Sequence, residues 1–254
     1  MVLTIAKQMP CKNLRVKKYC SFGRNSTGTK ISRYKGGGHK QFYRKIDFWR
    51  KKLFCRGNIQ SIEYDPNRTA FISLIYYSDG TKNYILSPKG IEKGRVIERG
   101  LSVQVLCGNA IPLLSIPLGT NIHNVEFYPG SGGKIARSAG TVVQLIAQEN
   151  GYATLFIPSS EIRQITQNCW ATIGQAGNVK HNNKKQGKAG KSRWLGRRPK
   201  IRGSAINPVD HPHGGGEGRC PIGHKKPLTL WGKSRSGIKT PCPQKYSNNF
   251  ILRR

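Results

Sequence analysis

The middle of the chain alternates between short apolar runs and turn-forming residues. Turn signals stand at 65–67 (Asp-Pro-Asn) and 78–80 (Ser-Asp-Gly). Between and around them lie runs rich in β-branched and aromatic residues, at 59–64, 69–77 and 83–86. Short runs of this kind, bounded by Gly, Pro, Asn and Asp, are typical of β-strands. The pattern predicts a small β-barrel or sandwich over residues 59–117.

A second group of apolar runs begins near residue 118. Strands are predicted at 122–128, 141–147, 152–157 and 169–173, with Glu149-Asn150-Gly151 as a hairpin turn. Each of the two groups spans about 60 residues, a size at which a domain buries little surface and is only marginally stable alone. We therefore expect the two units to pack together or on a partner.

The two ends of the chain lack this pattern. Residues 1–58 show no sustained period of 2 or 3.6, and the apolar runs stop after Gly177. No segment carries a convincing helical period, so the sequence predicts an all-β fold. The chain is thus divided into a 1–58 extension, units at 59–117 and 118–179, and a 180–254 extension.

The charge follows the same division. The whole chain carries 44 Lys+Arg and 11 Asp+Glu, a net charge of +33. The extensions hold almost all of it, with +15 over 1–58 (16 basic, 1 acidic) and +17 over 180–254 (19 basic, 2 acidic). A compact protein with this charge repels itself, which indicates a polyanionic partner. RNA or DNA fits better than an anionic membrane, because glycines and aromatic residues are interleaved with the charges.

The N-terminal extension contains a run of three glycines between basic residues, at 35–40 (Lys-Gly-Gly-Gly-His-Lys). Such a run lets backbone amides approach phosphates, although a flexible linker has the same composition. Aromatic residues follow it and argue against a linker. They suit either stacking on unpaired bases or packing on the core, and the sequence leaves both uses open. These residues are Phe42, Tyr43, Phe48, Trp49 and Phe54.

The most distinctive stretch is 207–219, which reads Asn-Pro-Val-Asp-His-Pro-His-Gly-Gly-Gly-Glu-Gly-Arg. Pro208 and Pro212 fix φ and remove two amide donors, and the glycines lack the Cβ that limits close approach. A packed core gains nothing from such a segment. We expect it to dock on a polar surface, and nucleic-acid backbone is the best match.

The same stretch could also be considered for catalysis or metal binding, because His211 and His213 stand beside Asp210. A zinc site normally needs four ligands, and the nearest cysteine is Cys220. A general base needs a defined pocket, which a Pro/Gly loop is not expected to supply. We therefore expect no catalytic residue, no metal site and no cofactor of the protein itself; magnesium would come with the RNA.

The cysteine spacing and the hydropathy indicate in which kind of cellular compartment the protein works. Seven widely spaced cysteines contain no C-x-x-C pair, so free thiols in a reducing compartment are expected. No apolar run approaches the 18 residues of a membrane span. The N-terminus shows neither a signal-peptide nor a transit-peptide pattern, and we expect the protein to work where it is made.

Four segments in order along the chain resemble the universal large-subunit ribosomal protein family known as L-two. They are 36–40 (Gly-Gly-Gly-His-Lys), 64–68 (Tyr-Asp-Pro-Asn-Arg), 136–140 (Ala-Arg-Ser-Ala-Gly) and 207–219. Segments 43–48, 116–120 and 221–227 look most similar to plastid-encoded members. The family usually ends in a dense Lys/Arg tail, which Pro241-Cys242-Pro243-Gln244 and Asn248-Asn249 dilute here.

This resemblance implies an OB-fold RNA-binding domain at 59–117, then an SH3-like barrel at 118–179, with both extensions threading into the large-subunit rRNA. It also implies a place near the peptidyl transferase centre and at the interface with the small subunit, among other ribosomal proteins and away from any membrane. The loop matching 207–219 penetrates the RNA in this family, and the counterpart of His211 is linked to translation activity. Plastid stroma is the expected location, with the bacterial cytoplasm or a mitochondrion as alternatives.

The charge, the motifs and the resemblance together predict the residues that bind RNA. They are Arg24, Lys35, Gly36, Gly37, Gly38, His39, Lys40, Arg44, Lys188, Arg193, Trp194, Arg197, Arg198, Lys200, Arg202, Asn207, Asp210, His211, His213, Gly214, Gly215, Gly216, Glu217, Arg219 and Trp231. The alternative is a protein that coats nucleic acid without sequence or shape preference, for which charge alone would suffice. A phosphate-handling enzyme built on 36–40 lacks the strand–loop–helix context.

Overall fold

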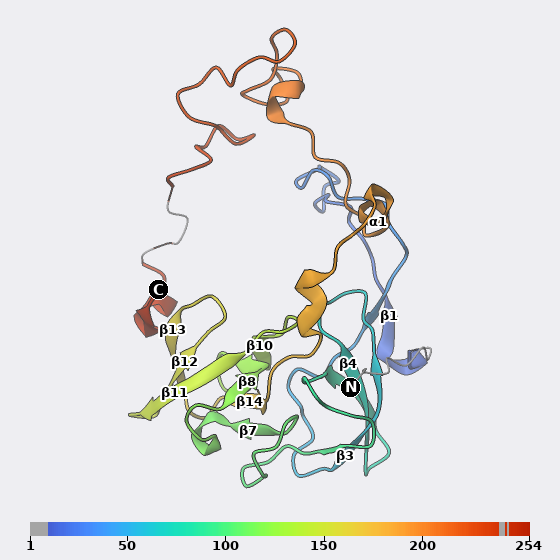
Figure 1. Cartoon of the computed structure of the whole chain (residues 1–254), viewed down its shortest axis with the longest axis vertical. Helices are drawn as coiled ribbons and strands as arrows, with labels where there is room; N and C mark the ends of the chain where they lie inside the picture. Colours follow the sequence, from blue (N-terminus) through green and yellow to red (C-terminus); the bar gives the residue numbers. More distant parts are fainter. Residues whose placement is uncertain (1–9, 239–241, 243) are drawn as a thin grey trace. The chain divides into compact units, whose positions relative to one another are not determined.

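The computed structural model describes residues 10–238, 242 and 244–254, and they form two compact units (Figure 1). We call the first the barrel unit; it comprises the described part of 1–19, together with 40–185 and 246–254. The second, the loop unit, comprises 20–39 and the described part of 186–245. Each unit is taken by itself below.

The first sheet of the barrel unit has four antiparallel strands in the order β5-β4-β3-β6. They are β3 (Gly57–Glu63), β4 (Ile72–Tyr77), β5 (Lys82–Leu86) and β6 (Val96–Ile97). Its core includes Ile59, Ile75 and Ile85, which are almost fully buried. The register of β3 on β4 shifts between Ile59 and Ser61, and such a bulge increases the local bend and twist.

The second sheet has seven antiparallel strands in the order β15-β13-β12-β11-β8-β14-β7. They are β7 (Ala110–Pro112), β8 (Asn121–His123), β11 (Val143–Glu149), β12 (Tyr152–Phe156), β13 (Ile162–Thr166), β14 (Trp170–Ile173) and β15 (Ile251–Arg253). A separate pair, β9 (Val125–Glu126) and β10 (Gly133–Ile135), completes this half of the unit. Figure 1 shows β11, β12 and β13 as neighbours.

The remaining elements are short. β1 (Arg15–Lys17) pairs with β2 (Phe42–Arg44). The 3₁₀ turns are η1 (Lys12–Leu14), η2 (Leu113–Ser115), η3 (Val179–Asn183), η4 (Gly203–Ala205) and η5 (Tyr246–Phe250). The described residues contain one α-helix, α1 (Ala189–Trp194), which corrects the expectation of no helix. None of its six residues is buried, so the sequence has no apolar helical face there from which the helix could be predicted.

The expected strands correspond closely to β3, β4, β5, β11, β12 and β14. The turn Asn150-Gly151 is present, with φ of 50° and 78°. The run 122–128 is divided into β8 and β9 because Asn124 adopts a φ of 51°. β13 was not predicted because its two most buried positions are Arg163 and Ile165, so a charged residue occupies an inward site and interrupts the alternation.

The two sheets are joined by side chains within the barrel unit. The indole N–H of Trp49 donates to the Gly130 carbonyl at 3.1 Å, and the Arg99 guanidinium lies 4.0 Å from the centre of the Trp170 ring. The amide of Ala139 donates to the hydroxyl of Thr69. These contacts tie each sheet to the other half of the unit.

The division at 58, 117 and 179 stays a prediction. β7 precedes residue 118 and pairs with β14 in the second sheet. β15 follows the basic C-terminal segment and pairs with β13. The second sheet therefore takes strands from three of the four predicted parts of the chain.

Candidate nucleic-acid interface

The loop unit holds all but two of the predicted RNA-binding residues; only Lys40 and Arg44 belong to the barrel unit. The ion pairs between described residues all lie in the barrel unit. The exposed cations of the loop unit thus have no carboxylate within ion-pair distance in the described chain, and their charge remains available to a partner.

The three glycines at 36–38 lie against a second segment of the loop unit. The amide of Gly36 donates to the Gly196 carbonyl at 3.1 Å, and that of His39 to the Trp194 carbonyl at 2.9 Å. A Cβ on Gly38 would lie 2.7 Å from the Gly196 nitrogen. Glycine is required here because two backbones meet. The sequence led us to expect that the backbone amides of this run approach phosphates. The amides of Gly36 and His39 instead donate hydrogen bonds to carbonyls of the protein itself.

The stretch 207–219 folds on itself. The amide of Gly215 donates to the Ile206 carbonyl at 3.0 Å, and that of Gly214 to the His211 carbonyl at 2.8 Å. A Cβ on Gly214 would lie 2.3 Å from the Asn207 carbonyl oxygen. The glycines therefore allow the loop to close, a use that sequence reasoning did not assign to them.

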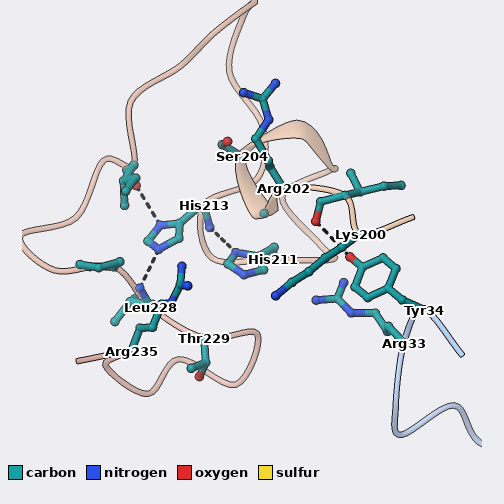
Figure 2. Close-up of a pocket in the computed structure, with 14 residues that line it drawn as sticks. Arg33, Tyr34, Lys200, Arg202, Ser204, His211, His213, Leu228, Thr229 and Arg235 are labelled. Carbon is teal, nitrogen blue, oxygen red and sulfur yellow. Dashed lines mark hydrogen bonds between the residues drawn. The ribbon is translucent and has the colours of Figure 1, made fainter. Parts of the chain in front are cut away.

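A chain of hydrogen bonds fixes the protonation of the two histidines in this loop (Figure 2). His213 Nε2 accepts the Leu228 amide proton at 2.7 Å, so Nδ1 carries the ring proton and donates to the Ile222 carbonyl at 3.0 Å. The His213 amide donates to His211 Nδ1 at 3.0 Å. The proton of neutral His211 is consequently on Nε2, which is left as a donor.

The electrostatics favour neutral His211. Partial burial is the largest cause that lowers its pKa, followed by repulsion from His213 and then from Arg33. A Cβ on Gly203 would lie 2.6 Å from Cε1 of His211, so the imidazole packs closely on the start of η4. The ring is thus held in position by contacts on two sides.

His211 borders a cavity of about 470 Å³ in the loop unit (Figure 2). Four basic side chains line it, from Arg33, Lys200, Arg202 and Arg235, and no carboxylate of the described residues does. The cavity is open to solvent on one side. It is formed where the loop meets residues 33–34, 200–204 and 227–235.

Several lining residues were not predicted from the sequence. Those with polar side chains are Arg33, Tyr34, Ser204, Thr229 and Arg235. Arg33-Tyr34 combines a basic and an aromatic residue, as 42–44 does. The same sequence pattern could therefore have identified Arg33 and Tyr34 as candidate RNA-binding residues. The others carry no local signal, because segments far apart in the chain bring them together.

Two tryptophans of the loop unit are open to solvent. Trp194 is 58% exposed and Trp231 72% exposed. The Lys188 ammonium lies 4.8 Å from the centre of the Trp194 ring. An exposed ring beside a cation is suited to stacking on an unpaired base.

The N-terminal aromatics differ in burial. Phe48 packs on the core formed by Ile46, Ile72, Leu74 and Tyr84. Phe54 is 70% exposed and Trp49 46%.

Arg44, one of the predicted RNA-binding residues, has an internal partner. Its side chain is only 12% exposed and lies 3.6 Å from the buried carboxylate of Asp65. Arg68 pairs with the same carboxylate. These contacts give Arg44 a role in the stability of the barrel unit, and its role in RNA binding stays a prediction.

Two kinds of feature are absent from the described residues. No three His, Cys, Asp or Glu side chains within 10–238, 242 and 244–254 are grouped as metal ligands. In the same residues no helix has the length and apolar character to cross a bilayer. Cys11, Cys20, Cys55, Cys107, Cys169 and Cys220 are free thiols.

An all-β core joined to a cationic loop unit, in whose described part no lysine or arginine forms an ion pair with a carboxylate, defines a nucleic-acid-binding protein. Residues 11–99 match the family model "Ribosomal Proteins L2, RNA binding N-terminal domain", and residues 106–232 match "Ribosomal Proteins L2, C-terminal domain". The chain belongs to the ribosomal protein L2 family. Its fold is accordingly an OB-fold followed by an SH3-like barrel, as the resemblance implied.

Two relatives support this placement. The chain is 57% identical over 235 residues to the large ribosomal subunit protein uL2c of Huperzia lucidula, covering 92% of this chain and 84% of the relative. It is 56% identical over 245 residues to uL2c of Angiopteris evecta, covering 96% and 88%. Both relatives are named as proteins of the large ribosomal subunit.

Proposed function

We propose that this chain is a structural constituent of the large ribosomal subunit in plastids. It binds large-subunit rRNA through the loop unit, near the peptidyl transferase centre and facing the small subunit. By positioning RNA it supports subunit association, tRNA binding and peptide-bond formation. The observation that carries the proposal is the His211 donor, held at a cavity lined by four basic side chains.

Positioning fits His211 better than catalysis. A general base needs a free lone pair, and Nδ1 of His211 already accepts the His213 amide at 3.0 Å. No carboxylate lines the cavity among the described residues to orient the ring or stabilise an imidazolium. What the ring offers is an N–H donor at Nε2, which suits a phosphate or a base acceptor. The protein is accordingly not an enzyme, and it needs no cofactor beyond the magnesium of the RNA.

A shape-independent coating protein is a poorer match. Such a protein needs charge alone, and here Gly203, Gly214 and Gly38 are each required by a close backbone or ring contact. The loop unit therefore has a defined fold that presents its charges in a fixed arrangement. Other ribosomal proteins and the small subunit are the further partners we propose.

Substitution of His211 tests the positioning role. Gln can accept the His213 amide and still donate from its NH₂ group, whereas Ala can do neither. We expect large subunits with His211→Ala to assemble and to form peptide bonds about tenfold more slowly, the cost of one lost hydrogen bond to a charged partner. His211→Gln should retain most of the rate.

His224→Ala serves as the control, because that exposed ring bonds only to the Pro212 carbonyl at 3.2 Å. Rates of peptide-bond formation by purified subunits distinguish a positioning role of His211 from proton transfer. An equally severe loss in Gln and Ala would point to proton transfer and contradict positioning.

A further inference from the structure

Of the described residues of the loop unit, His213 alone is buried, with 9% of its surface exposed. These residues therefore form no apolar core, and the one side chain that they enclose is an imidazole. A buried polar group is costly unless its hydrogen-bonding atoms are paired. The partners of His213 consequently show what holds this part of the chain together.

Every nitrogen of His213 has a partner inside the protein (Figure 2). The ring binds two later segments, because Nδ1 donates to the Ile222 carbonyl at 3.0 Å and Nε2 accepts the Leu228 amide proton at 2.7 Å. The backbone amide of His213 donates to His211 Nδ1 at 3.0 Å. No nitrogen of His213 is therefore left to donate to a phosphate or a base.

His211 differs from His213 in this respect. Its Nδ1 accepts the His213 amide, whereas its Nε2 remains a donor. The centres of the two rings are 5.2 Å apart. The buried ring thus lies beside the ring that can donate to a partner, and a hydrogen bond links the two residues.

The segment that holds the His213 ring is itself fixed by a turn. The Arg235 amide donates to the Pro227 carbonyl at 2.9 Å, and the Thr229 amide donates to the Lys233 carbonyl at 2.7 Å. This turn fixes the Leu228 amide, and that amide in turn fixes the His213 ring. A shift of the ring would displace the backbone amide that His211 accepts.

We infer that His213 is a positioning residue for His211. It holds the 207–216 part of the loop on residues 222 and 228, and through its amide it sets the direction in which His211 Nε2 donates. The inference rests on the proposed role of His211 and deepens it, because it assigns the His213 ring to the protein's own structure instead of to the RNA. The direction of the His211 donor then depends on Leu228, which follows His213 by 15 residues.

The first test replaces the buried ring. His213→Leu keeps an apolar side chain in place and removes both ring hydrogen bonds, so the Leu228 amide and the Ile222 carbonyl lose their partner. We expect large subunits with this variant to form peptide bonds about tenfold more slowly, the effect of a buried group left unpaired. His213→Gln can still accept the Leu228 amide proton and should lose clearly less. His224→Leu is the matched control, because this exposed ring lies 5.3 Å from that of His213, and it should retain the rate.

The second test asks whether His213 acts through His211. With His211→Ala and His213→Leu combined, we expect a rate no lower than with His211→Ala alone, because the donor that His213 positions is already absent. If the two losses multiply to about a hundredfold, His213 contributes independently and the inference is wrong. An unchanged rate with His213→Leu alone would also overturn it. If His213→Leu prevents assembly, His213→Gln takes its place in the same cycle.

Failure of the inference and failure of the proposed function give different results. If His211→Ala alone leaves the rate of peptide-bond formation unchanged, the proposed role of His211 fails and the inference fails with it. If His211→Ala slows the reaction and the His213 variants add an independent loss or none, only the inference fails.

Discussion

The barrel unit and the loop unit use the same basic residues in opposite ways. In the barrel unit, Arg44 and Arg68 share the carboxylate of Asp65, and Arg163 donates to the Ser247 carbonyl at 3.0 Å and lies over the Phe127 ring. In the loop unit, Arg33 and Arg235 border a cavity without a carboxylate among the described residues. A carboxylate partner makes the charge of a cation part of the fold, whereas the charge of a cation that has only a ring contact, such as Arg33 over Tyr34, remains for another molecule.

The glycines show that the two units do not differ in how closely their backbones are packed. In the barrel unit a Cβ on Gly133 would lie 2.1 Å from Asn124 Oδ1, and in the loop unit one on Gly214 would lie 2.3 Å from the Asn207 carbonyl oxygen. Both units require glycine for close internal contacts. They differ in what lies outside those contacts, which is an apolar core in one and unpaired charge in the other.

The largest expected effect concerns the salt dependence of RNA binding. Four exposed cations of the loop unit, Lys188, Arg193, Arg197 and Arg198, are changed together to Gln. If each contacts one phosphate, the slope of log affinity against log salt should fall by about 3, and affinity at 0.1 M salt by about a thousandfold. Titration of an rRNA fragment at several salt concentrations measures both quantities.

The control for this test changes four exposed cations of the barrel unit, Lys82, Lys89, Lys93 and Arg95. It removes the same charge, so a general electrostatic effect would alter both proteins alike. If the slope of log affinity against log salt falls equally in the two variants, the cations of the loop unit have no special role in RNA binding.

The next effect concerns an internal carboxylate. Asp65 is fully buried, and Asp65→Ala would leave Arg44 and Arg68 without their carboxylate in a largely buried position. We expect the free energy of unfolding to fall by about 3–5 kcal/mol, the usual cost of breaking a buried pair. Asp79→Ala removes the exposed partner of Lys52 and should cost far less. Denaturant unfolding of the two variants gives the comparison, and equal losses would contradict it.

A smaller effect depends on pH. His123 is fully buried, and burial is the main cause that lowers its pKa to about 4; its Nδ1 faces the Gly174 carbonyl at 2.7 Å. The unfolded chain binds this proton near pH 6.5 and the folded chain does not. The stabilisation is therefore complete above about pH 6.5 and is lost as the pH falls toward 4, by up to about 3 kcal/mol.

His123→Asn isolates that contribution, because Asn can donate to the Gly174 carbonyl and does not titrate. Hydrogen exchange of the β11 and β12 amides, measured between pH 7 and pH 4, should show a shallower loss of protection in the variant. An identical pH dependence would mean that other groups cause the loss.

The sequence specified the elements better than it specified the site. Runs with clear alternation, such as those that form β4 and β12, were predicted because their burial follows the strand period. β13 was missed because Arg163 occupies an inward position. The Ser247 carbonyl that accepts a hydrogen bond from this buried guanidinium lies 84 residues away in the chain. The loop at 207–219 was recognised by composition, whereas the cavity beside it depends on segments at 33–34 and 227–235 that meet only in three dimensions.

The pairing of β15 with β13 has a topological consequence. The loop unit's residues 186–245 leave the barrel unit after 185 and return to it at 246, so this segment is a loop closed at both ends. A free chain end can be threaded through an opening in RNA that is already folded, but a closed loop cannot. An RNA segment that encloses these residues must fold around them, or the strand Ile251–Arg253 must first detach. The order in which protein and RNA acquire their structures is thereby constrained by one three-residue strand.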